Sequence, residues 1–254
     1  MTKDLDKQAI GRELADSIAE ARQLRSARAS DPRPEDYVRL KEWQEARLAR
    51  TYADLLASPR YSLAAGFFLS DLYGPKDFRT RDEELARVVP IMTHMLPARA
   101  LATLLEAVKM DTLSESLDTD MVFALRRAGQ TRAIDWPAYV AAYRSCGRRK
   151  DRELQIALIN KIGKTLDRLT RMPLIHFSLA LMSGPAHLSG LGALHSFLQG
   201  GFDAFSFMKG ADEFLAIVTQ RESALMRELF ANPNARYPDF PEVTQPALPD
   251  ARSC

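Results

Sequence analysis

The sequence is poor in cysteine and in long apolar runs. Its 254 residues include only two cysteines, Cys146 and Cys254, too few for the disulfide framework of a small secreted domain. The longest apolar stretch, near residues 63–73, is far shorter than the ~18 residues expected of a membrane span. Acidic residues lie at the N-terminus, where a secretory signal needs bases followed by an apolar run. We therefore expect a cytoplasmic protein that does not enter the membrane.

The motifs of the common enzyme classes are also missing. The chain has no Walker A pattern, no glycine-rich dinucleotide fingerprint, no Gly-x-Ser-x-Gly, no His-Glu-x-x-His and no Cys-x-x-Cys. It also lacks Glu-x-x-His, with which helical bundles commonly hold a pair of metal ions. These absences favour a non-catalytic protein, and we predict neither a cofactor nor a metal ion.

Apolar residues recur at spacings of three and four, and the alternation typical of strands is nearly absent. The pattern predicts an all-α, single-domain bundle of about nine helices. Residues 1–30 should form a loosely packed helix, because their apolar stripe is thin, and residues 31–232 should form the core. Residues 233–254 hold five of the fourteen prolines and are expected to be a flexible, proline-rich tail.

Local patterns predict two helix boundaries. Asp135 is expected to cap a short helix over residues 136–146. In the segment 97–127, the two halves place their apolar residues on nearly opposite faces, so we predict a break near Asp111. Asp111, Glu115 and Asp118 share one helical face, which we interpret as solvated surface.

Three polar residues interrupt apolar helical segments: Asp71, His176 and Glu222. A buried carboxylate must be paired, hydrogen-bonded or protonated, so a structural ion pair is the favoured interpretation of both acids. His176 follows Pro173 among apolar neighbours, and a hydrogen-bonded core histidine is favoured there. The alternative is that the three residues converge on a buried polar site for catalysis or for a haem or metal cofactor.

The clearest charge signal is a basic segment, residues 126–152, with eight arginines and lysines against two aspartates. Its anion-binding candidates are Arg144, Arg148, Arg149, Lys150 and Arg152. Some of them meet the start of a helix, whose free N–H groups attract anions, so a phosphate-bearing ligand or nucleic acid is the functional alternative. A solvated basic face is the favoured interpretation. Cys146 in these surroundings is a candidate for a thiol with a lowered pKa.

Residues 67–73 read Phe-Phe-Leu-Ser-Asp-Leu-Tyr. This segment resembles the signature of the bacterial proteins called FFLEELY-motif proteins, with Ser70 and Asp71 in place of the two central glutamates. The resemblance extends over about residues 50–97, and it transfers no activity and no catalytic residue to this chain. The leading hypothesis is therefore a non-catalytic binding or regulatory module whose partner is a protein or a small ligand, with nucleic acid less favoured.

Overall fold

The computed structural model describes residues 6–72, 79–95, 98–172 and 189–238, together with Leu181, Gly184 and Ala186. This part of the chain forms ten α-helices and one short π-helical segment, and it contains no strand. The predicted all-α bundle is thereby confirmed. In chain order the elements are α1 (Lys7–Ala29), α2 (Glu35–Thr51), α3 (Ala53–Ala57), α4 (Ser62–Phe67), the π-segment η1 (Phe68–Leu72), α5 (Arg79–Met95), α6 (Ala98–Arg127), α7 (Trp136–Cys146), α8 (Arg149–Thr170), α10 (Gly192–Met208) and α11 (Asp212–Ala231).

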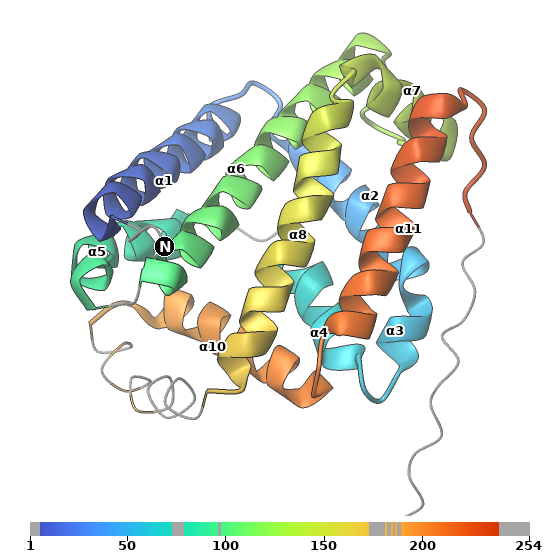
Figure 1. Cartoon of the computed structure of the whole chain (residues 1–254). Helices are drawn as coiled ribbons and strands as arrows, with labels where there is room; N and C mark the ends of the chain where they lie inside the picture. Colours follow the sequence, from blue (N-terminus) through green and yellow to red (C-terminus); the bar gives the residue numbers. More distant parts are fainter. Residues whose placement is uncertain are drawn as a thin grey trace, which may run out of the picture.

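Helix α6 crosses the middle of the bundle, with α1 on one side and α8 and α11 on the other (Figure 1). Its first half packs Leu101 and Leu105 against α1 and α5, whereas its second half packs Met121 and Leu125 against α2, α7 and α11. The break predicted near Asp111 is therefore wrong. The helix continues unbroken for 30 residues because neighbours cover it on two different faces.

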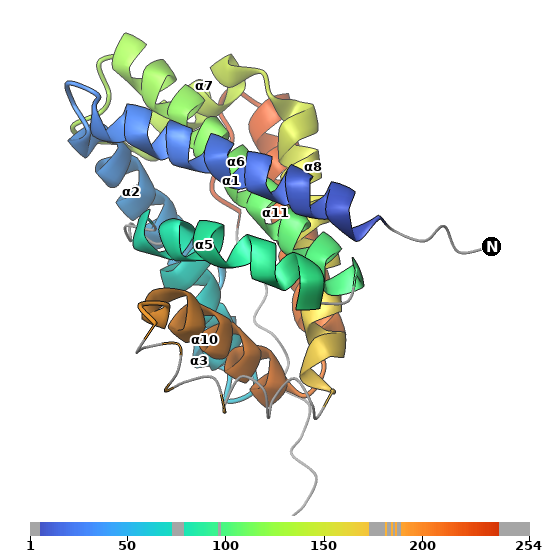
Figure 2. The same cartoon turned by 90° about the vertical axis from the view of Figure 1, so that its left-hand side faces the viewer.

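Helix α1 lies beside α5 and α6, and α5 in turn lies beside α10 (Figure 2). Leu14 and Ile18 of α1 are buried in the apolar cluster that α5 and α6 complete. A Cβ atom at Gly11 would lie 2.6 Å from Oγ1 of Thr93, so glycine is what lets α1 approach α5 this closely. The expectation of loose packing does not agree with these contacts, because even a thin stripe suffices when it is fully buried.

Helix α7 has the predicted start and end. The Asp135 side chain accepts a hydrogen bond of 2.8 Å from the backbone N–H of Ala138, and Gly147 ends the helix with a φ of 65°. The helix also anchors the C-terminal segment, because Trp136 donates a 2.6 Å hydrogen bond to the carbonyl of Ala235. Residues up to Tyr237 therefore pack on the bundle rather than starting a flexible tail at residue 233, and residues 239–254 lie outside the described residues.

None of the described helices is both long and apolar enough to cross a membrane.

Candidate functional site

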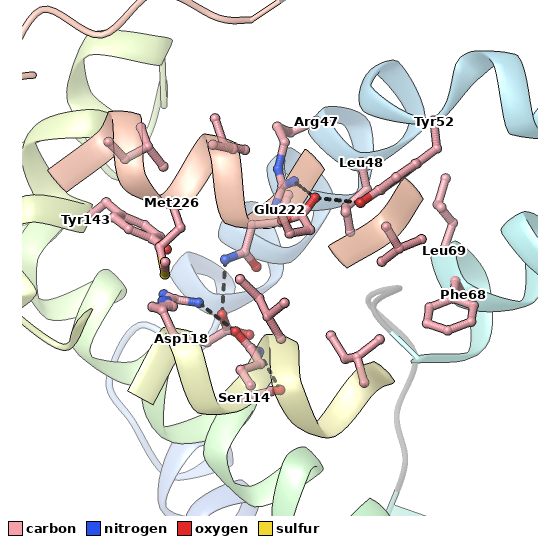
Figure 3. A pocket seen from close by; sticks show the side chains of 18 of the residues that line it. Arg47, Leu48, Tyr52, Phe68, Leu69, Ser114, Asp118, Tyr143, Glu222 and Met226 are labelled. Carbon is pink, nitrogen blue, oxygen red and sulfur yellow. Dashed lines mark hydrogen bonds and ion pairs between the residues drawn. The ribbon is translucent and has the colours of Figure 1, made fainter. Parts of the chain in front are cut away.

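A cavity of about 80 Å³ lies between α2, η1, α6, α7, α8 and α11 (Figure 3). One water molecule needs roughly 10–15 Å³ of such space, so the cavity has room for several waters or for a small organic molecule. All of the residues that line it come from described helices or their caps, and they span positions 44 to 229 of the chain.

The cavity has an apolar end and a polar end. Phe68 and Leu69 of η1 lie at one end, Tyr143 and Met226 lie toward the other with Asp118 and Ser114, and the Arg47–Glu222 pair lies between (Figure 3). Further apolar lining comes from Leu48, Ala65, Ile159, Phe214 and Val218, and further polar lining from Gln44, Arg152 and Gln155. Ligand sites typically combine apolar walls with a few convergent polar groups, and this cavity has that composition.

Two consecutive phenylalanines, Phe67 and Phe68, pack beside the apolar end of the cavity. Phe67 packs on Phe197 of α10 with ring centroids 5.5 Å apart, and a Cβ atom at Gly201 would lie 3.0 Å from Cζ of Phe67. Because Gly201 has no Cβ atom, the ring of Phe67 can pack closely against α10. Phe68, one residue further, turns toward the core and packs on Phe214 with centroids 5.5 Å apart. At the junction of α4 and η1, two consecutive phenylalanines therefore contact different neighbours.

Glu222 projects from α11 into an ion pair with α2. Its Oε1 lies 2.6 Å from Nη1 of Arg47, and the hydroxyl of Tyr52 donates to the same oxygen at 2.9 Å. The interpretation of Glu222 as a partner in an interhelical ion pair is confirmed. The Nε–H of Arg47 is buried and finds no hydrogen-bond acceptor in the described part of the chain.

One hydrogen-bonded pair and one hydrogen-bonded chain of three residues lie at the polar end. The amide of Gln44 donates to Oδ1 of Asp118 at 3.0 Å, and burial raises the pKa of that carboxyl group. On α8, Arg152 donates to Oε1 of Gln155 at 3.3 Å, and Gln155 donates to the hydroxyl of Ser114 at 2.7 Å. These contacts join α2, α6 and α8 around one space.

The face that carries Asp111 and Glu115 is not solvated, so that interpretation is wrong. Arg25 of α1 ion-pairs with Asp111 at 2.5 Å and also with Asp82 of α5, while Lys41 of α2 pairs with Glu115 at 2.6 Å. Glu115 is 5% exposed and Arg25 is 3% exposed. The acids of α6 therefore hold α1, α2 and α5 together through a buried ion network.

Sequence reasoning missed this network, although a signal was present. Arg25 continues the spacing of Leu14, Ile18 and Ala21 along the buried stripe of α1. An arginine on such a stripe indicates a buried partner of opposite charge.

Of the three buried polar candidates, Asp71, His176 and Glu222, the structure describes the side chain of Glu222 alone. Glu222 lines the cavity. The side chain of Asp71 and the whole of His176 lie outside the described residues. Their convergence with Glu222 therefore stays a prediction.

The five anion-binding candidates do not share one cationic face. Arg144 donates to the carbonyls of Leu229 and Phe230 at the end of α11, and Arg152 lines the cavity. The other three candidates lie at the start of α8, where Arg148 is half-buried and Arg149 and Lys150 are exposed.

Two arginines of the basic segment are held by acids of other helices or loops. Arg126 makes two 2.8 Å hydrogen bonds to the carboxylate of Asp31, which lower the pKa of that group to about 2. Arg148 pairs with Asp120 of α6 at 2.7 Å and with Asp151 at 2.6 Å. Internal ion pairs thus neutralise part of the charge that the sequence displays.

These contacts separate the effects of two neighbouring substitutions. Arg148→Gln is expected to lower the free energy of unfolding by about 1 kcal/mol, because it removes a partly exposed pair that ties α8 to α6. Arg149→Gln removes only an exposed pair with Glu153 on the same helix and should cost about 0.3 kcal/mol. Urea denaturation of both variants measures the difference, and equal losses would contradict it.

Nucleic-acid binding by the basic segment stays a prediction, and an Arg149→Gln/Lys150→Gln variant tests it without removing the ion pairs of Arg126 and Arg148.

Cys146 does not match the expected reactive thiol. Burial raises the pKa of its thiol group, and Sγ lies 3.9 Å from Sδ of Met121 in the core. Arg148 and Arg152 favour the thiolate, but desolvation outweighs them.

Among the described residues, no group of three or more histidine, cysteine, aspartate or glutamate side chains is arranged to hold a metal ion.

The fold and the cavity define an all-α bundle with a small internal site of mixed polarity. The chain belongs to the family described as "Domain of unknown function (DUF8198)", which matches residues 23–236. The matched region includes all the residues that line the cavity and most of the bundle. No curated protein and no solved structure matched the chain.

Proposed function

We propose that the protein is a non-catalytic binding module that takes a small molecule into the cavity between α2, α6, α8 and α11. The observation that carries the proposal is the cavity itself, with aromatic and aliphatic walls at one end and hydrogen-bonding groups at the other. Its two acids, Asp118 and Glu222, are already held by neighbouring side chains, which favours recognition of a ligand over proton transfer.

The resemblance of residues 67–73 to FFLEELY-motif proteins fits this proposal. We infer that the chain is one of these proteins and that the segment serves to build the apolar end of the cavity, through Phe68 and Leu69. We also place the protein in the cytoplasm, where a free thiol such as that of Cys146 is ordinary.

A substitution that fills the cavity tests the proposal. Val218 lines the cavity from α11, so Val218→Phe is expected to occupy the space and abolish binding. A panel of small acids, amides, alcohols and amines is added to the wild type, and the rise in the temperature of thermal unfolding measures binding. A ligand at 100 times its Kd stabilises the folded state by about 2.7 kcal/mol.

The matched control is Ala216→Phe, which adds the same ring at an exposed position of the same helix. We expect the wild type and the control to gain stability from at least one compound, and Val218→Phe to gain none while still melting cooperatively. Equal gains in all three proteins, or no gain from any compound in the wild type, would show that the cavity is only a packing defect.

A further inference from the structure

Arg152 differs from the other buried basic residues of the described chain. Four such side chains are buried: Arg25, Lys41, Arg152 and Arg221. Three of them pair with a carboxylate at 2.5 to 2.7 Å. Within the described residues, Arg152 pairs with none, although it is only 9% exposed. A buried cation without a counter-charge is strongly unfavourable, so its position at the cavity requires an explanation.

The contacts of Arg152 leave most of its donors unused. Its guanidinium donates one hydrogen bond, to Gln155 at 3.3 Å, and lies over the ring of Tyr143 at 4.7 Å from the centroid. A guanidinium carries five N–H donors in a planar fork that suits the two oxygens of a carboxylate. The aromatic ring and the amide fix the fork beside the cavity without satisfying it.

Neither of the two acids that line the cavity forms a direct ion pair with Arg152. Glu222 is engaged by Arg47 and Tyr52. Asp118 accepts a hydrogen bond from Gln44, and burial raises the pKa of its carboxyl group, although the charges of Lys41 and Arg152 oppose that rise. Arg152 is therefore the one basic residue of the cavity lining that has no direct ion pair among the described residues.

Two tyrosines add neutral donors to the same lining. Tyr139 and Tyr143 both line the cavity and are nearly buried, and neither hydroxyl has a hydrogen-bond partner among the described residues. Their O–H groups and the guanidinium can donate to a ligand that enters this end of the cavity. An anion with two or more acceptor oxygens complements such a surface.

The opposite end of the cavity limits the charge and the size of the rest of the ligand. Phe68, Ile159 and Phe214 line it with apolar groups, so a tail that enters this space should carry no charge. The volume of about 80 Å³ limits that tail to a few carbon atoms.

We propose that the cavity binds a small carboxylate, whose head group pairs with Arg152 and whose short apolar tail lies toward Phe68, Ile159 and Phe214. This inference rests on the proposed function and names the class of ligand for the same site. The carboxylate supplies the counter-charge of Arg152 and accepts from the tyrosine hydroxyl groups.

Binding of matched acids and amides tests the charge requirement. Butanoate, hexanoate and benzoate are compared at pH 7.5 with butanamide, hexanamide and benzamide, which have the same shape without the charge. Trp43 stacks on Tyr139 with ring centroids 4.1 Å apart, so tryptophan fluorescence can follow occupancy, and calorimetry gives Kd. We expect at least one acid to bind at least tenfold more tightly than its amide.

Three variants assign that preference to Arg152. Arg152→Gln should bring the ratio of the two Kd values close to one, and Arg152→Lys, which keeps the charge, should retain part of it. Arg149 lies one turn before Arg152 and is exposed. Its replacement, Arg149→Gln, should leave the ratio of the two Kd values unchanged. Circular dichroism and cooperative melting establish that each variant is folded.

The possible failures separate this inference from the proposed function. If the amides bind as tightly as the acids, or if the preference survives Arg152→Gln, the carboxylate inference is wrong and a ligand cavity remains. If none of the six compounds binds, the carboxylate inference is also wrong, and the wider panel with Val218→Phe then decides whether the cavity binds anything.

Discussion

The Arg25→Met variant is expected to lose about 3–5 kcal/mol of its free energy of unfolding. Arg25 is 3% exposed and ion-pairs with Asp82, Asp111 and Glu115, where α1 meets α5 and α6. Methionine keeps much of the apolar stem but leaves these carboxylates without their central cation. Their mutual repulsion, and burial that already raises the pKa of Asp82, then oppose folding.

Urea denaturation measures this loss, and Arg22→Met is the matched control. Arg22 lies on the exposed face of the same helix, one turn earlier, so its replacement should change stability by less than about 0.5 kcal/mol. A loss below about 1 kcal/mol for Arg25→Met would mean that Arg28, Lys41 and Arg81 neutralise the acids without it.

Glu222→Leu is expected to be equally damaging, because it leaves Arg47 as a nearly buried charge without an acid. The predicted loss is about 3–5 kcal/mol, and the hydroxyl of Tyr52 loses its acceptor as well. Replacing both charges, in Arg47→Met/Glu222→Leu, removes the unpaired cation and should recover most of the loss.

A double-mutant cycle quantifies this coupling. The free energies of unfolding of the wild type, Arg47→Met, Glu222→Leu and the double variant are compared, with Gln220→Leu on the exposed side of α11 as control. A double variant that loses as much as the sum of both single variants would show that the two side chains contribute independently and that their ion pair adds little.

The sequence predicted the fold class and some local boundaries because those depend on neighbouring residues. The 3.6-residue periodicity indicated helices throughout, and α7 spans residues 136–146 with Asp135 as its cap, as its local pattern predicted. Such signals need no knowledge of what the helix packs against.

The wrong predictions concern features that depend on contacts with distant segments of the chain. The two apolar faces of α6 suggested a break near Asp111, because one sequence cannot reveal that α1 covers one face and α7 and α8 another. Asp111 and Glu115 looked solvated for the same reason: their partners, Arg25 and Lys41, are about 70 to 90 residues away.

The candidate site was predictable only in fragments. Glu222 and Arg152 were singled out separately, one as a buried acid and one as part of a basic segment, and both line the same cavity. A cavity is the space that several elements fail to fill, so no local pattern encodes its position or size.

The central position of α6 also limits how a molecule can reach the cavity. Ser114 and Asp118 form part of the cavity wall, whereas Asp111 and Glu115, which share a helical face with Asp118, are bound by Arg25 of α1. Helix α1 therefore lies behind that wall and need not move when the cavity fills or empties (Figure 1). A molecule that enters or leaves the cavity is expected to pass between α2, α7, α8 and α11, which line it, while the ion network holds α6 to α1 and α5.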